Sequence, residues 1–133
     1  MLKKSAIIGF CLFNVVLFIL IGIEVAAVTP ERAMLEGVTQ RIYASISTLD
    51  YIMAALWGAI LYTTLTAKSE HFLRASWLYL GFYLCDIHFS HYMSMEMNDP
   101  YFTPGALFLV VIQAWFLYWA KTRIDAANVA VSN

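Results

Sequence analysis

Charged residues are scarce in this chain. Asp, Glu, Lys and Arg make up only 13% of its 133 residues, and the formal net charge is −1. A soluble domain usually contains about a quarter charged residues. The shortage of charge therefore argues against a soluble globular domain. The balance of signs leaves no basic surface of the kind that holds nucleic acid.

Cysteine and histidine are also rare, with two and three residues respectively. Cys11 and Cys85 form no closely spaced pair, which argues against a disulfide framework or a thiol-redox enzyme. Three histidines are too few for the centres of membrane desaturases and hydroxylases. A haem held between two helices would need histidines on separate helices, whereas His88 and His91 share one. Nucleotide-binding glycine loops and the serine-hydrolase elbow are missing as well.

Hydrophobic residues, by contrast, make up 62% of the chain, and the mean hydropathy is +0.71. This composition is typical of an integral membrane protein surrounded by a lipid bilayer. The hydrophobic residues gather into four long runs. Together with the short second and third connections, these runs predict a single all-α domain of four transmembrane helices in an antiparallel bundle. The predicted spans cover residues 5–28, 49–67, 75–95 and 103–120.

The first run must be distinguished from a cleaved signal peptide. Lys3 and Lys4 precede it, and residues 25–27 (Val-Ala-Ala) resemble a small-residue cleavage site. The apolar stretch 5–23 is longer than the ~7–15 residues of a signal-peptide core. We therefore expect this segment to be retained as the first span.

The connection between the first two spans is the longest. Thr29 and Pro30 match the N-cap and first-turn positions of a helix. Residues 31–47 are too polar to cross a membrane. Apolar residues recur in this segment at every fourth position, at Met34, Val38, Ile42 and Ile46. This period predicts an amphipathic helix on the membrane surface, and the alternatives are an ordered loop or a polar extension of the second span.

Lysine and arginine are distributed unequally between the two ends of the predicted bundle. If the N-terminus is cytoplasmic, six of the eight basic residues lie inside and two lie outside. The inner residues are Lys3, Lys4, Lys68, Arg74, Lys121 and Arg123, and the outer residues are Arg32 and Arg41. Positively charged connections tend to stay in the cytoplasm. We therefore expect a protein of a bacterial-type inner membrane with both termini cytoplasmic.

Small and amide residues inside the spans predict where helices touch. Ala54 and Gly58 are four residues apart and would let another helix approach the second span closely. Asn14 and Gln113 lie inside the first and fourth spans, where a single amide mostly bonds to a neighbouring helix. That neighbour belongs to this chain, to a second copy or to a larger membrane protein.

The third span contains Asp86, the polar residue whose position in the membrane has the highest free-energy cost. At ~1.5 Å per residue from the inner end, Asp86 lies ~18 Å along the helix, just beyond the middle of a ~30 Å hydrocarbon core. An ionisable residue at that depth is a functional candidate by default. His88 and His91 follow in the outer half of the same span. Glu24 and Asp50 lie at the outer ends of the first and second spans.

Three functions are consistent with these residues. In the first, Asp86, Asp50 and Glu24 bind or pass a cation or a proton, with the histidines as outer ligands or relays. In the second, His88 and His91 hold a divalent transition metal in a small membrane enzyme, and a carboxylate completes the site. In the third, the polar groups attach a structural subunit to a larger membrane complex. The first, non-enzymatic function is our leading hypothesis, because Asp86 has the costliest position.

Overall fold

The computed structural model describes the backbone of residues 2–35, 37, 39–66, 68–97 and 102–132, and the side chains of residues 4–35, 37, 39–66, 68–89 and 104–129. Within this part of the chain the fold is all-α and has no strand. The helices are α1 (Leu2–Ala26), α2 (Pro30–Leu35), α3 (Gln40–Leu65), α4 (Ser69–Met97) and α5 (Phe102–Ser132).

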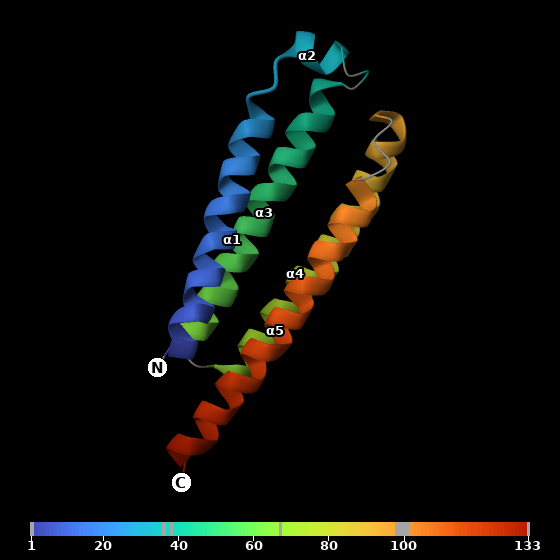
Figure 1. The fold of residues 1–133 in the computed structure, drawn as a ribbon. Helices are drawn as coiled ribbons and strands as arrows, with labels where there is room; N and C mark the ends of the chain where they lie inside the picture. Colours follow the sequence, from blue (N-terminus) through green and yellow to red (C-terminus); the bar gives the residue numbers. More distant parts are fainter. Residues whose placement is uncertain (1, 36, 38, 67, 98–101, 133) are drawn as a thin grey trace.

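The four long helices form two antiparallel pairs (Figure 1). α1 packs mainly on α3, whereas α4 packs to a similar extent on α5 and on α3. Both termini lie at one end of the molecule, which we call the terminal end, and α2 covers the tip of the α1–α3 pair at the opposite end, the α2 end. The two pairs converge toward the terminal end and lie further apart toward the α2 end (Figure 1).

Three of the helices are long and apolar enough to cross a membrane. Their apolar segments are Lys4–Ala26, Gln40–Leu65 and Pro104–Val129. α4 has 29 residues, or about 43 Å at 1.5 Å per residue, so it is long enough to cross as well. Its composition separates it from the other three, because Glu70, Arg74, Asp86 and His88 lower its hydropathy. The structure thus supports three apolar spans, and the fourth stays a prediction.

The start of α2 follows the sequence signals. α2 begins at Pro30, and the backbone N–H of Arg32 donates to Thr29 Oγ1 at 3.3 Å. The backbone N–H of Ala33 donates to the Thr29 carbonyl at 3.0 Å. Thr29 therefore is the N-cap and Pro30 the first helical residue, as their order in the chain predicts.

The single amphipathic helix expected over residues 31–47 does not form. α2 ends at Leu35, and α3 begins at Gln40 rather than at about residue 49. Gly37 adopts the left-handed conformation with φ 71°, which suits glycine at the end of a helix. Its backbone N–H donates to the Met34 carbonyl at 3.1 Å. Residues 40–47 are therefore a polar extension of the second span, which was one of the alternatives.

α5 continues far beyond the expected end of the fourth span at residue 120. It reaches Ser132, so its 31 residues extend about 46 Å at 1.5 Å per residue, well beyond a ~30 Å hydrocarbon core. Lys121 and Asp125 form an ion pair one turn apart with an N–O distance of 2.5 Å. The hydroxyl of Ser69, at the start of α4, donates to Asp125 Oδ1. The ion pair stabilises the polar part of α5, and the Ser69–Asp125 hydrogen bond joins this part to the start of α4.

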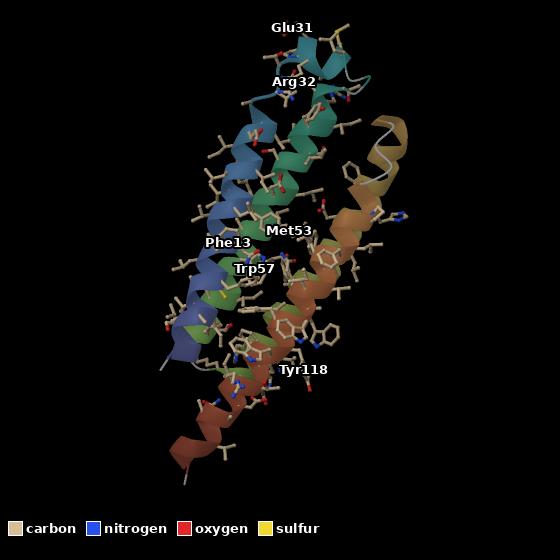
Figure 2. The ribbon with its side chains drawn as sticks, in the orientation of Figure 1. Phe13, Glu31, Arg32, Met53, Trp57 and Tyr118 are labelled. Atoms are coloured by element: carbon tan, nitrogen blue, oxygen red, sulfur yellow. The ribbon has the colours of Figure 1, made fainter. Side chains whose placement is uncertain are left out.

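Aromatic side chains fill the space between the two helix pairs. Met53 and Trp57 point from α3 into this space (Figure 2), and both are fully buried. The ring of Trp57 lies 5.6 Å from that of Phe10 on α1 and 4.8 Å from that of Tyr79 on α4. Phe10 also stacks on Phe116 of α5 at 3.9 Å between ring centroids. Residues of all four long helices therefore meet in one core.

The outer faces of the long helices are apolar too. Phe13 on α1 and Tyr118 on α5 point away from the core (Figure 2) and are 60% and 72% exposed. Large exposed hydrophobic residues occur on every long helix, including Leu20, Tyr62, Leu65, Trp77, Leu78, Phe108 and Trp115. A soluble monomer rarely exposes so much contiguous apolar surface. The surface is compatible with a multi-pass membrane protein surrounded by lipid.

α1 and α3 approach each other closely at a glycine that the small-residue pattern did not indicate. A Cβ on Gly22 would lie 2.9 Å from the ring of Tyr51. The hydroxyl of Ser47 donates to the Gly22 carbonyl at 2.8 Å. A Cβ on Gly58 would meet nothing within 4 Å, so Gly58 does not mark a helix contact, whereas Ala54 is buried.

Candidate functional site

An open groove lies between α3 and α4, toward the α2 end of the bundle. Its volume is about 410 Å³. We call it the α3–α4 groove. The residues that line it are Ser45, Thr48, Leu49, Phe82, Cys85, Asp86 and Phe89. In this direction the two helix pairs lie further apart than toward the terminal end (Figure 1).

Asp86 is the ionisable carboxyl group that lines the groove. The helical period places it there, because Tyr79, Tyr83 and Asp86 are spaced by four and three residues and so share one face of α4. The other polar side chains in the groove are satisfied locally. The hydroxyls of Ser45 and Thr48 donate to the carbonyls of Arg41 and Ala44 within α3, at 3.0 and 2.8 Å.

A second carboxyl group lies beside the groove. Asp50, half-buried on α3, is close enough to Asp86 for the two negative charges to interact. Its Oδ2 atom is buried and has no hydrogen-bond partner among the described residues. None of the residues lining the groove is Lys or Arg. Desolvating a carboxylate without a positive partner is costly, so the pair creates a local demand for a proton or a cation.

A line of polar side chains leads from these carboxyl groups into the core. Tyr83 interacts electrostatically with both Asp86 and Asp50, and its ring centroid lies 5.7 Å from that of Tyr79. The Tyr79 hydroxyl donates to Gln113 Oε1 at 2.5 Å. Polar groups on α3, α4 and α5 are therefore arranged in sequence from the groove toward the middle of the bundle.

The line ends on α1, where the two amides predicted to contact helices meet each other. Gln113 Nε2 donates to Asn14 Oδ1 at 3.3 Å, and Asn14 Nδ2 donates to the Phe10 carbonyl at 2.8 Å. Both amides are buried, at 2% exposure for Asn14 and 6% for Gln113. They join α1 to α5 within this chain, so they do not need a partner protein to be satisfied.

The remaining residues predicted for the site do not join the carboxyl pair. Glu24 is exposed on α1, His88 is exposed on α4, and neither lines the groove. His88 follows Asp86 by two positions, which is about 200° around a helix of 3.6 residues per turn, so it faces another direction. The side chain of His91 lies outside the described residues.

No metal site is assembled in the part of the chain whose side chains the structure describes. No group of three or more His, Cys, Asp or Glu side chains comes together there. The convergence of Glu24, Asp50 and His88 on one ion, which the sequence allowed, is therefore not seen among these residues. What the helices do bring together is Asp50 and Asp86.

Two functional candidates, Tyr79 and Tyr83, were missed by the sequence analysis. Phe72, Ser76, Tyr79 and Tyr83 are buried at alternating four- and three-residue spacings, and Asp86 continues the same series. This period marks the face of α4 that packs against the other helices. It was a signal in the sequence that placed both tyrosines on the same face as Asp86.

Comparisons with protein families, with curated proteins and with solved structures yield no match for this chain.

Proposed function

We propose that this chain is a small multi-pass membrane protein that binds or passes a cation or a proton at the α3–α4 groove. The observation that carries the proposal is the pair of half-buried carboxyl groups, Asp86 and Asp50, at a groove without a lining Lys or Arg. Asp86 is the principal ionisable group, and Asp50 contributes the second negative charge. Glu24 would contribute a carboxylate, and His88 and His91 would serve as outer ligands or relays, for an ion or proton that approaches from outside the membrane.

The proposed topology has four spans and both termini in the cytoplasm of a bacterial-type cell. Three helices are apolar enough to cross, and α4 lies between α3 and α5 in the chain and contacts both. Lys68 and Lys121 are placed near the terminal end, whereas Arg32 and Arg41 are placed near the α2 end. The basic residues favour a cytoplasmic terminal end, and the groove then opens toward the outer side.

The polar line from Asp86 to Asn14 supports passage of a proton in particular. Proton relays in membranes are built around buried Asp, Glu and His side chains, and Asp86 and Asp50 would supply the titratable groups here. Tyr79, Gln113 and Asn14 are joined by hydrogen bonds, and Tyr83 lies between Tyr79 and Asp86. Tyr83, Tyr79 and Gln113 continue inward from the carboxyl pair. Tyr83, Tyr79, Gln113 and Asn14 carry no carboxylate that could bind a bare ion. An inorganic ion would therefore have to pass by another route.

The test is a flux measurement with the full chain reconstituted in liposomes. A potassium gradient and valinomycin set the membrane potential, and trapped indicators report pH and sodium. We expect wild-type vesicles to move protons or a monovalent cation faster than empty vesicles. Asp86→Asn should lower the rate to that of empty vesicles, and Asp50→Asn should also lower it. Glu70→Gln is the matched control, since Glu70 is an exposed carboxylate at the opposite end of the same helix.

Binding without passage gives a different outcome in a second measurement. The melting temperature of the purified chain should then rise with one cation or with protonation, and the rise should disappear in Asp86→Asn. A wild type with neither flux nor a cation-dependent or pH-dependent melting temperature that requires Asp86 would contradict the proposal. The hypothesis of a structural subunit of a larger membrane complex would then be tested by co-purification.

A further inference from the structure

We infer that the α3–α4 groove takes an organic monocation with an apolar body, rather than a bare metal ion. The inference rests on the proposed function, because it names the class of cation for the same site. Three features of the groove support it: its size, the chemistry of its walls and its charge.

The size of the groove suits a small molecule. A volume of about 410 Å³ lies within the range of roughly 300–1,000 Å³ that is common for small-molecule sites. A dehydrated inorganic ion would fill only a small part of this space. The rest would hold water against apolar walls, which an organic ligand can cover instead.

The walls of the groove are mostly apolar and aromatic. Leu49 lines it from α3, and Phe82 and Phe89 line it from α4. Aromatic faces attract organic cations through their quadrupole, and quaternary ammonium groups are recognised in this way. A charged carboxyl group beside aromatic walls is therefore complementary to a ligand that combines a positive centre with a hydrophobic body.

The oxygen atoms in the groove are too few to replace the hydration shell of a hard metal ion. Ca²⁺ requires about six to eight oxygen ligands, and Mg²⁺ requires about six in a strict octahedron. The side-chain oxygen atoms on the lining are one each from Ser45 and Thr48 and two from Asp86, which is fewer than either ion requires. Asp86 is the carboxylate on the lining, so the groove provides charge without a coordination shell. A positive nitrogen or phosphorus that carries its own organic substituents needs no such shell.

The charge near the groove favours a cation over a neutral ligand of the same shape. Asp50 adds a second negative charge that interacts with that of Asp86, and its Oδ2 atom is buried without a hydrogen-bond partner among the described residues. A cation placed beside Asp86 would interact favourably with both groups. In an apolar site such attraction is stronger than in water.

The test is equilibrium binding of tetraphenylphosphonium to the purified full chain in detergent. We expect saturable binding, and a neutral compound of similar shape, triphenylphosphine oxide, should bind much more weakly. Asp86→Asn should weaken tetraphenylphosphonium binding by about tenfold or more, as removal of a desolvated charge partner does. Asp86→Glu should retain binding, since it keeps the charge.

A second pair of variants tests the aromatic wall. Phe82→Ala should weaken binding by about twofold to fivefold, as expected for the loss of a cation–π contact. Phe108→Ala is the matched control, because Phe108 is exposed on the outer face of α5. It should leave the affinity unchanged.

Cys85 provides a direct report of where the ligand lies. It lines the groove and is exposed, whereas Cys11 is buried. Modification of the wild-type protein by a maleimide should therefore occur mainly at Cys85, and Cys85→Ala verifies this assignment. Saturating tetraphenylphosphonium should slow the modification, and triphenylphosphine oxide should not.

Three results would overturn the inference. They are a folded wild type without saturable binding, equal binding of the neutral compound, and unchanged affinity in Asp86→Asn. If Asp86→Asn fails to fold, Phe82→Ala and the protection of wild-type Cys85 decide instead. Flux of protons or inorganic cations that depends on Asp86, without tetraphenylphosphonium binding, would show that only the ligand class is wrong. Absence of both would remove the proposed function as well.

Discussion

At the scale of single residues, the polar groups of the bundle interior are the most informative. Asn14, Tyr79 and Gln113 come from three different helices and form one hydrogen-bonded chain. A buried amide that loses its partner keeps the cost of its desolvation. These three residues therefore specify how α1, α4 and α5 are placed relative to one another.

Removing the hydroxyl of Tyr79 should destabilise the fold measurably. Tyr79→Phe keeps the ring contacts with Trp57 and Tyr83 but leaves Gln113 Oε1 without its donor. Interhelical hydrogen bonds in membrane proteins contribute about 0.5–2 kcal/mol, so we expect a loss of that size in the free energy of unfolding. Denaturant titration in detergent measures it.

The control for this variant is Tyr118→Phe. Tyr118 is 72% exposed on the outer face of α5, and its loss of a hydroxyl should leave the stability unchanged. If Tyr79→Phe unfolds at the same denaturant concentration as the wild type and Tyr118→Phe, the hydrogen-bonded chain does not stabilise the bundle.

The histidines provide the second prediction at this scale. His88 is exposed, and among the described side chains no third ligand joins it in a metal-binding group. We therefore expect the purified chain to contain much less than one equivalent of zinc, copper or iron. The double variant His88→Ala/His91→Ala should melt at the wild-type temperature. Elemental analysis that finds a near-stoichiometric metal, lost in the double variant, would restore the hypothesis of a metal-dependent membrane enzyme.

At the scale of helices, the packing of α1 on α3 depends on one close approach. Gly22 faces the ring of Tyr51, and its carbonyl accepts a hydrogen bond from Ser47. Ser47 and Tyr51, one turn apart on α3, therefore both contact α1 at Gly22, near the α2 end. The small residues on α3 matter less than the pattern of spacing suggested, because Gly58 has open space beside it.

Two alanine substitutions should therefore differ in their effect on stability. Gly58→Ala should be neutral or stabilising by up to about 1 kcal/mol, because alanine favours the helix and meets nothing. Gly22→Ala should be less stable than Gly58→Ala by about 1 kcal/mol or more, because its Cβ forces the Tyr51 ring to move. Thermal unfolding of both variants in the same detergent measures the difference. Equal melting temperatures would show that α1 and α3 do not pack closely at Gly22.

At the scale of the whole molecule, the distribution of charge and the divergence of the helix pairs determine how the site faces the solvent. Both termini lie at one end (Figure 1), and the groove lies toward the other. The Lys121–Asp125 ion pair belongs to the C-terminal part of α5. With a cytoplasmic terminal end, a ligand would reach the groove from the outer side of the membrane.

Reporter fusions test this topology. A fluorescent protein that matures only in the cytoplasm should be bright when fused after the C-terminus. When the same fluorescent protein is inserted at Gly37, between α2 and α3, the general secretory route should export it and it should be dark. An alkaline phosphatase inserted at Gly37 should be active. The reverse pattern would place the groove on the cytoplasmic side. An active phosphatase at the C-terminus would mean that the chain crosses the membrane an odd number of times.

The sequence by itself determined the all-helical class, the start of α2 and the three apolar helices, because these depend on local features: runs of apolar residues, a threonine cap and a proline. The sequence also identified Asp86 as a candidate, because the free-energy cost of an ionisable residue in a membrane depends on its depth along a single helix. The helices α3 and α5 extend beyond the predicted spans, to Gln40 and to Ser132, so the bounds of the apolar runs do not mark the ends of these helices.

Only the tertiary structure decided which side chains meet. The hydrogen bond between Asn14 and Gln113 spans 99 positions, and the electrostatic interaction between Asp50 and Asp86 depends on how α3 packs against α4. No local pattern carries such information, since a helix of given sequence packs in many registers and rotations against another. The groove around Asp86 also depends on how α3 and α4 pack, and the shapes of many side chains together determine that packing.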